Sequence, residues 1–144
     1  MEKGWYAYLH STSGNQVKFG WEDVPYSGGT LSWSTDSAVV TLDEWNHVAW
    51  SHAVPDAEAK IYINGVRVAG NSQSPTGTVI DSSSTLYIGN NAAGTRGFHG
   101  IIDEVFLYNR VLTATDANGD ADEGDTLTGG EIYKNYKHGL GKHK

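Results

Sequence analysis

One short stretch of the chain restricts its possible folds more than any other. Along Lys60–Ile63 the residues alternate between the two faces of a β-strand, which is the two-residue period of a half-buried strand. The dipeptide Asn64-Gly65 follows, and it is the preferred sequence of a two-residue β-turn. Val66–Val68 then returns to residues that favour strands. The stretch therefore predicts a tight antiparallel hairpin.

Similar short segments recur roughly ten residues apart and are separated by glycine-rich turns. The chain has 18 glycines in 144 residues, nearly twice the usual share, and these favour turns between strands over helices. Thr128 and Glu131 have the spacing of a helix capping box, so a short helix is expected over residues 128–137. The predicted fold class is all-β, an antiparallel β-sandwich of the jelly-roll type with a short C-terminal helix. The strands are expected at residues 5–10, 16–21, 30–34, 38–41, 46–52, 59–63, 66–69, 78–80, 85–89 and 100–108.

Length and charge exclude several classes of protein. A chain of 144 residues is the length of one domain, so residues 1–144 are taken as a single unit. Its net charge of −7 and the lack of a basic aromatic stripe argue against nucleic acid as a partner. No apolar run approaches the ~20 residues of a membrane span, and the first residues do not resemble a signal peptide. Any export signal is therefore expected outside this chain.

The segment 114–127 has an unusually acidic composition and is predicted to be an insertion before the terminal helix. Oxygen-bearing side chains alternate along it, which is how short loops offer ligands to a hard cation such as calcium. An EF-hand is excluded, because Ala121 and Leu127 stand where that motif needs Gly and Glu. The alternative is a solvated acidic turn that binds nothing. The candidate calcium ligands are Asp116, Asn118, Asp120, Asp122 and Asp125.

Five motifs in order, spread over about 70 residues, resemble the laminin-G-like jelly rolls of the concanavalin A-like lectin/glucanase superfamily. They are Trp45–Ala49, Ile61–Val66, Leu86–Gly89, Phe98–Val105 and Leu107–Thr113. The resemblance implies a jelly roll and a recognition module of a larger extracellular, cell-surface or virion protein.

The resemblance also implies that one or two strands which usually precede the segment at Trp5 are missing. Without them, the edge beside Ile102–Tyr108 would be unpaired and open to a strand from elsewhere. Three explanations stay open: a fragment of a longer protein, a variant with a shortened edge, or completion by a second copy in a homo-oligomer.

A second calcium position follows from the resemblance alone. Related jelly rolls hold a structural calcium near the position of Asp103, on the expected last strand. The alternative is that Asp103 only accepts backbone hydrogen bonds at a bend of the chain.

The resemblance makes carbohydrate the leading candidate ligand, and the aromatic residues are compatible with it, because flat rings stack on the C–H faces of sugars. Trp45 and Trp50 are expected in the core, since a sandwich needs large inward side chains. The residues expected to stack on a sugar are Trp21, Tyr26 and Trp33, and those expected to donate hydrogen bonds from a rim loop are Asn90, Asn91 and Arg96. The alternative places all of these residues in the core or in ordinary loops.

Catalysis has no support in the sequence. The Glu-x-Asp-x-x-Glu pattern of the related laminarinases is absent, and adjacent Asp103 and Glu104 would point to opposite faces of a strand. No nucleophile elbow occurs, and the histidines lack the spacing of a metal site. The resemblance implies a non-catalytic carbohydrate-binding module, with calcium as a candidate cofactor. A structural or adhesive protein–protein module is the alternative.

Overall fold

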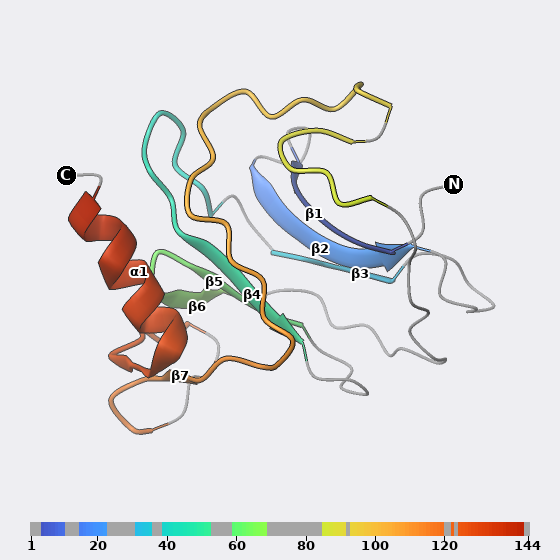
Figure 1. The fold of residues 1–144 in the computed structure, drawn as a ribbon. Helices are drawn as coiled ribbons and strands as arrows, with labels where there is room; N and C mark the ends of the chain where they lie inside the picture. Colours follow the sequence, from blue (N-terminus) through green and yellow to red (C-terminus); the bar gives the residue numbers. More distant parts are fainter. Residues whose placement is uncertain are drawn as a thin grey trace.

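The structure is a computed structural model of the 144-residue chain. It describes residues 4–10, 15–22, 31–35, 39–52, 59–68, 85–91, 93–119, 122 and 124–142. These residues form two three-stranded antiparallel sheets, a short strand and a C-terminal helix (Figure 1).

The first sheet is a meander of β1 (Gly4–His10), β2 (Gln16–Glu22) and β3 (Leu31–Ser34). Its register places Phe19 of β2 opposite Trp33 of β3. Because directly opposed residues lie on the same face of a sheet, this pair defines one face of all three strands. Thr35 extends the pairing, since its backbone N–H donates to the carbonyl of Val17 and its hydroxyl accepts from the N–H of Val17.

The second sheet is a meander of β4 (Val48–His52), β5 (Ala59–Ile63) and β6 (Val66–Val68). Asn64 and Gly65 join β5 to β6 with φ values of 51° and 78°, as a type I′ turn requires. The Asn64 side chain also accepts from the backbone N–H of His47 and donates to Asn46, which ties the turn to the entrance of β4. The hairpin predicted from the sequence is confirmed.

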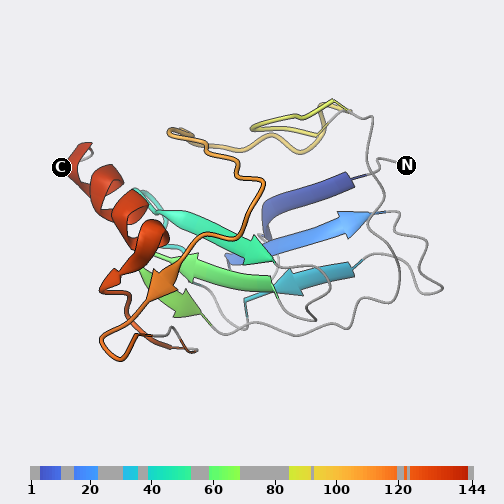
Figure 2. The same cartoon turned by 60° about the horizontal axis from the view of Figure 1, so that its bottom comes forward.

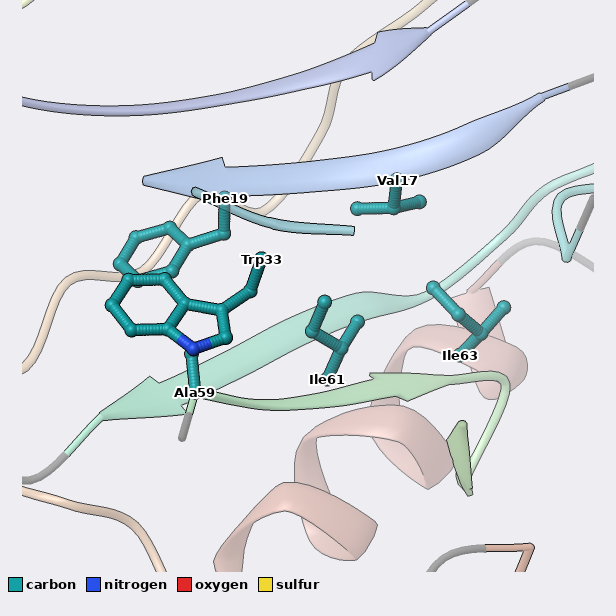
Figure 3. Close-up of a cluster of buried hydrophobic side chains, with 6 residues drawn as sticks. All are labelled: Val17, Phe19, Trp33, Ala59, Ile61 and Ile63. Carbon is teal, nitrogen blue, oxygen red and sulfur yellow. The ribbon is translucent and has the colours of Figure 1, made fainter. Parts of the chain in front are cut away.

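The two sheets face each other across one apolar core (Figure 3). Trp33 is fully buried at 0% exposure, and its ring stacks on Phe19 with the ring centroids 6.0 Å apart. The rings of Phe19 and Trp50 are 5.3 Å apart, so the contact bridges the two sheets. The buried side chains of this core are Val17, Phe19, Trp33, Ala59, Ile61 and Ile63.

A second apolar cluster covers the outside of the second sheet. Tyr62 alternates with the inward Ile61 and Ile63, so it faces away from the first core. It packs instead against Leu127 and against Ile132 of helix α1 (Gly130–Lys142). The strand β7 (Ala114–Thr115) runs beside the start of the helix, and Figure 2 shows both on the same side of the second sheet.

The antiparallel sheets and the C-terminal helix agree with the fold class predicted from the sequence, whereas the jelly-roll topology stays a prediction. Six of the expected strands, at 5–10, 16–21, 30–34, 46–52, 59–63 and 66–69, are strands over most or all of their length, and one, at 78–80, lies outside the described residues. Trp50 packs on the core as expected. Trp45 does not, because it is 45% exposed in the loop before β4.

Two expected strands, at 85–89 and 100–108, are not strands in the structure. The backbone enters the left-handed region at Gly89 (φ 81°) and at Glu104 (φ 53°), which an extended strand does not allow. Residues 39–41, within the strand expected at 38–41, also belong to a loop, where Thr41 bonds the side chain of Asn46.

Helix α1 begins at Gly130 and runs five residues beyond its expected end. The predicted capping box is wrong. The N–H of Thr128 donates to the carbonyl of Thr115, and the Glu131 carboxylate bonds Arg110 and Thr113. Thr113 supplies the cap from another segment, since its carbonyl accepts from the N–H groups of Glu131 and Ile132 and its hydroxyl accepts from Glu131.

The buried position of Trp33 yields a stability prediction. Trp33→Ala should lower the free energy of unfolding by about 3–5 kcal/mol, because it removes a large side chain from a closed core. Leu42→Ala is the control, since Leu42 is 59% exposed, and should change it by no more than about 0.5 kcal/mol. Urea denaturation followed by circular dichroism measures both, and equal effects would contradict the assigned core.

Candidate functional site

The outer face of the first sheet carries a pair of tyrosines. On β1, Tyr6 and Tyr8 are two residues apart and therefore share a face, while Leu9 on the opposite face packs against the core. Their ring centroids are 5.6 Å apart with 33° between the ring planes. Tyr8 is 39% exposed and Tyr6 is partly exposed. The two rings thus form an aromatic surface open to solvent.

Polar side chains from the next two strands continue this surface. The register places Lys18 of β2 opposite Tyr8 and Ser34 of β3 opposite Lys18, so one row crosses all three strands. Gln16 lies two residues before Lys18 and shares its face. Lys18, Ser34 and Gln16 are each partly exposed. We call Tyr6, Tyr8, Gln16, Lys18 and Ser34 the tyrosine face.

The tyrosine face combines the two kinds of group that bind a sugar. An aromatic ring packs against C–H surfaces, and an ammonium, an amide and a hydroxyl exchange hydrogen bonds with sugar hydroxyls. The sequence analysis missed Tyr6 and Tyr8. Their spacing on one strand was the available signal, but it identifies an outer face only once Val17 and Phe19 are known to point inward.

The three aromatic residues predicted to stack on a sugar have different outcomes. The prediction for Trp33 is wrong, because its side chain is fully buried between the sheets and presents no surface to a ligand. Trp21 lies in β2, opposite Trp5 and Leu31, but its side chain is outside the described part. Tyr26 lies outside the described residues altogether.

The predicted rim residues lie together in one loop after Gly89. The side-chain oxygen of Asn90 accepts from the N–H groups of Asn91 and Arg96. The side-chain oxygen of Asn91 accepts from the N–H groups of Thr95 and Arg96. Both amides therefore shape this loop, while the Arg96 side chain is exposed. Their role in ligand binding stays a prediction.

The acidic segment is hydrogen-bonded to the second sheet. The N–H of Arg67 in β6 donates to the carbonyl of Asp125, the N–H of Gly124 donates to the carbonyl of Arg67, and the N–H of Leu127 donates to the carbonyl of Gly65. The Arg67 guanidinium lies 3.9 Å from the carboxylate of Asp122. Residues 124–127 therefore extend the edge of β6, which is a structural role for this insertion.

The predicted calcium ligands are partly engaged with the loop itself. The Asp116 carboxylate accepts from the N–H groups of Asn118 and Gly119, and the side chain of Asn118 donates to it as well. The Asp125 carboxylate accepts from the N–H of Asp122. Asp120 lies outside the described residues.

Asp103 is exposed, and its carboxylate accepts from the N–H of Glu104. This bond is of the kind expected at a bend of the chain. In the described part of the chain, no group of three histidine or acidic residues is placed to hold a metal ion. The calcium positions therefore stay predictions.

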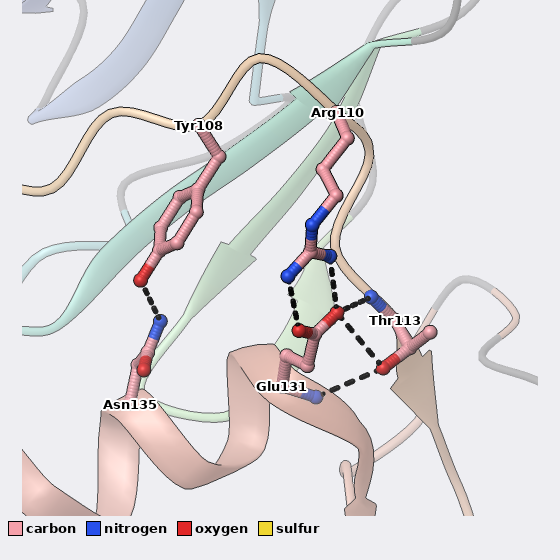
Figure 4. A network of polar contacts seen from close by, with 5 residues as sticks. All are labelled: Tyr108, Arg110, Thr113, Glu131 and Asn135. Atoms are coloured by element: carbon pink, nitrogen blue, oxygen red, sulfur yellow. Dashed lines mark hydrogen bonds and ion pairs between the residues drawn. The ribbon is translucent and has the colours of Figure 1, made fainter.

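A polar junction fixes the start of helix α1 to the segment before β7 (Figure 4). Both terminal nitrogens of Arg110 donate to the Glu131 carboxylate, at 2.7 and 2.6 Å. The N–H of Thr113 donates to the same carboxylate at 3.1 Å. The hydrogen bond from Arg110, followed by that from the Thr113 backbone, lowers the pKa of Glu131 from 4.5 to about 2.

The other end of α1 makes a second set of ionic contacts. Glu104 is half-buried and bonds the ammonium of Lys142, while Nδ1 of His138 lies 3.4 Å from its other carboxylate oxygen. The hydrogen bond from Lys142 is the main cause of a lowered pKa at Glu104. Sequence reasoning missed this contact because it joins residues 38 positions apart.

Comparison with known proteins places this geometry in a family. The model of the concanavalin A-like lectin/glucanases superfamily, of the laminin G type, matches residues 2–118. The chain belongs to this superfamily.

No curated protein matches the chain. A solved structure, that of residues 221–444 of an S-layer domain-containing protein from Clostridium thermocellum, is similar at 23% identity and a TM-score of 0.43. The match covers 75% of this chain and 57% of that one.

Helix α1 lies beyond the residues that match the superfamily model, and the Glu131 junction ties its start to the segment before β7. No helix in the described ranges has the length and apolarity needed to cross a membrane.

The Glu131 junction predicts a specific loss of stability in acid. The pKa of Glu131 is lower in the folded chain than the value of 4.5 expected after unfolding, so its stabilising effect is complete above about pH 4.5. The effect is lost as the pH falls from there toward about 2. Glu131→Gln should therefore have a lower melting temperature than wild type at pH 6, and the difference should shrink across this window.

The control is Glu44→Gln, which removes one carboxylate from an exposed turn. Melting temperatures of the three proteins from pH 6 to pH 2 make the comparison. A wild-type advantage over Glu131→Gln that stays constant down to pH 2 would contradict the role of the ionised carboxylate.

Proposed function

We propose that this superfamily member is a non-catalytic glycan-recognition module of a larger extracellular, cell-surface or virion protein. The tyrosine face is the observation that carries the proposal. It presents the rings of Tyr6 and Tyr8 beside an ammonium, an amide and a hydroxyl group. The opposite face of the same sheet packs into the core. The membership of the lectin/glucanase superfamily supports the same ligand class.

The rigidity of the site favours recognition of a repeating sugar chain. Tyr6 and Tyr8 are held by seven paired positions between β1 and β2, so little conformational entropy is lost when a ligand covers them. Each aromatic contact contributes only about 0.5–1.5 kcal/mol beyond its buried area. We therefore expect weak binding of single sugars and tighter binding of oligomers that span both rings.

Hydrolysis is not part of the proposal, because the described side chains of the tyrosine face include no carboxylate. Glycoside hydrolysis generally uses two carboxyl groups on either side of the scissile bond. A reducing-sugar assay with the same oligosaccharides tests this part of the proposal, and release of reducing ends would overturn it.

The tyrosine face predicts which substitutions weaken glycan binding. Tyr6→Ala and Tyr8→Ala should each weaken binding of neutral β-linked hexasaccharides by roughly 2- to 10-fold, since each removes one stacking ring. Isothermal titration calorimetry with glucose, xylose, galactose and N-acetylglucosamine hexamers measures the effect.

The matched control is Tyr87→Ala, because Tyr87 is a 51% exposed tyrosine outside the face. It should bind as wild type does. Equal binding by all four proteins, or equal losses in all three variants, would remove the tyrosine face as the site.

Calcium in the acidic segment is a separate proposal with its own test. Thermal melts with calcium and then with excess chelator are compared for wild type, Asp116→Asn and Asp103→Asn. A calcium-dependent rise in melting temperature, lost in one variant, would locate the ion, because a ligand that binds only the folded state stabilises it by mass action. The same melting temperature in every condition would argue against calcium.

A further inference from the structure

A strip of chain on the surface of the protein exposes an unusual amount of apolar area. Residues 101–111, which we call the apolar strip, belong to no sheet among the described residues. Six of its side chains are large, apolar and exposed: Ile101 (76%), Ile102 (44%), Val105 (50%), Phe106 (55%), Leu107 (57%) and Val111 (47%). Five of them lie within the seven positions 101–107, and clustered exposed apolar area marks an interaction surface more often than chance exposure.

The polar and the apolar side chains of the apolar strip have different surroundings. Its polar groups contact helix α1. The Tyr108 hydroxyl lies 3.5 Å from the side-chain amide of Asn135, and Arg110 is paired with Glu131 (Figure 4). Glu104 bonds Lys142 and lies beside His138. The helix residues are 131, 135, 138 and 142, with the spacing of one helix face. The strip therefore runs antiparallel to α1 and is fastened by its polar side chains, while its apolar side chains stay exposed.

This fastening pairs two of the three charged side chains of the strip. The carboxylate of Glu104 is paired with the ammonium of Lys142, and the guanidinium of Arg110 is paired with the carboxylate of Glu131. The third charged side chain is the exposed carboxylate of Asp103, toward the other end of the strip from Arg110. The whole chain carries a net charge of −7, so two copies repel each other over most approaches.

We propose that the apolar strip is a dimerisation surface and that its occupant is the same strip of a second copy. A matching strip offers an apolar surface of the same length with a carboxylate and a guanidinium toward opposite ends, as a self-complementary two-fold interface requires. The order of residues selects the orientation. An antiparallel arrangement centred between Phe106 and Leu107 places Asp103 of each copy near Arg110 of the other, and the guanidinium has five N–H donors for more than one carboxylate.

A parallel arrangement is excluded by the same residues. It would place the exposed carboxylate of Asp103 of one copy beside Asp103 of the other, and like charges at close range oppose association. The antiparallel dimer instead brings the apolar centre, Val105–Leu107, against itself.

Analytical ultracentrifugation of the whole chain over a concentration series up to roughly 1 mM tests the proposal. Wild type should dimerise, and Leu107→Glu should weaken the dimer at least about tenfold, since it buries a charge at the centre of the interface. The matched control is Leu42→Glu, an equally exposed leucine outside the strip at 59%, which should dimerise as wild type does. Both leucines are exposed, so circular dichroism and melting temperature should be unchanged in both variants.

A covalent test uses the lack of cysteine in this chain. Phe106→Cys should form a disulfide-linked dimer under mild oxidation because residue 106 lies next to the two-fold axis, whereas Leu42→Cys should form no disulfide-linked dimer. A monomeric wild type at every concentration would overturn the proposal. So would equal effects of the two glutamate variants, or equal crosslinking of the two cysteine variants. None of these outcomes bears on glycan binding, which the tyrosine variants test separately.

Discussion

The burial of Trp33 between the two sheets determines which surfaces the module presents. Trp33 stacks on Phe19 from the neighbouring strand, and both face β5 across the core. Because a strand alternates its side chains with a period of two, fixing these two residues also fixes every other residue of the first sheet as inward or outward. Tyr8, Lys18 and Ser34 form an outward row for this reason. A shift of one residue would bury that row and expose the core.

The same constraint explains why the sequence alone could not identify all the residues of a sugar-binding surface. Trp33 has the composition of a platform residue and lies near a glycine-rich connection, but side-chain type does not reveal which face of a sheet a residue occupies. The β5–β6 hairpin was predictable because it is a local structure. Alternation and the Asn64-Gly65 turn both lie within ten residues, and the φ values of 51° and 78° are those that the dipeptide favours.

The errors occurred where distant contacts decide the local structure. Residues 100–108 have strand-forming composition, yet Glu104 adopts a φ of 53° while its carboxylate bonds Lys142 far along the chain. Glu131 fits a capping box, but Arg110 and Thr113 engage its carboxylate instead. In both cases a charged side chain finds a partner that spacing along the sequence does not specify.

Helix α1 contacts both the second sheet and the apolar strip, because its apolar and polar residues lie on two different faces. Ile132 packs against Tyr62 and Leu127 on the second sheet, and the ring of Tyr136 lies against Gly65 of the β5–β6 turn. A Cβ at Gly65 would be 2.7 Å from that ring, so glycine is needed there both for its φ of 78° and for the approach of the helix. The polar face at residues 131–142 is left to hold the apolar strip.

Dimerisation through the apolar strip would affect how strongly the tyrosine face binds a polymer. The tyrosine face lies on the outside of the first sheet, whereas the apolar strip is fastened to α1, which covers the outside of the second sheet. A dimer formed through the strip would therefore carry two tyrosine faces in one particle and leave both uncovered. Linking two weak sites raises the apparent affinity for a repeating ligand by roughly 100- to 10,000-fold when both sites reach it. Dimerisation would in this way give a small aromatic surface useful affinity for a polymer, while binding of short sugars stays weak.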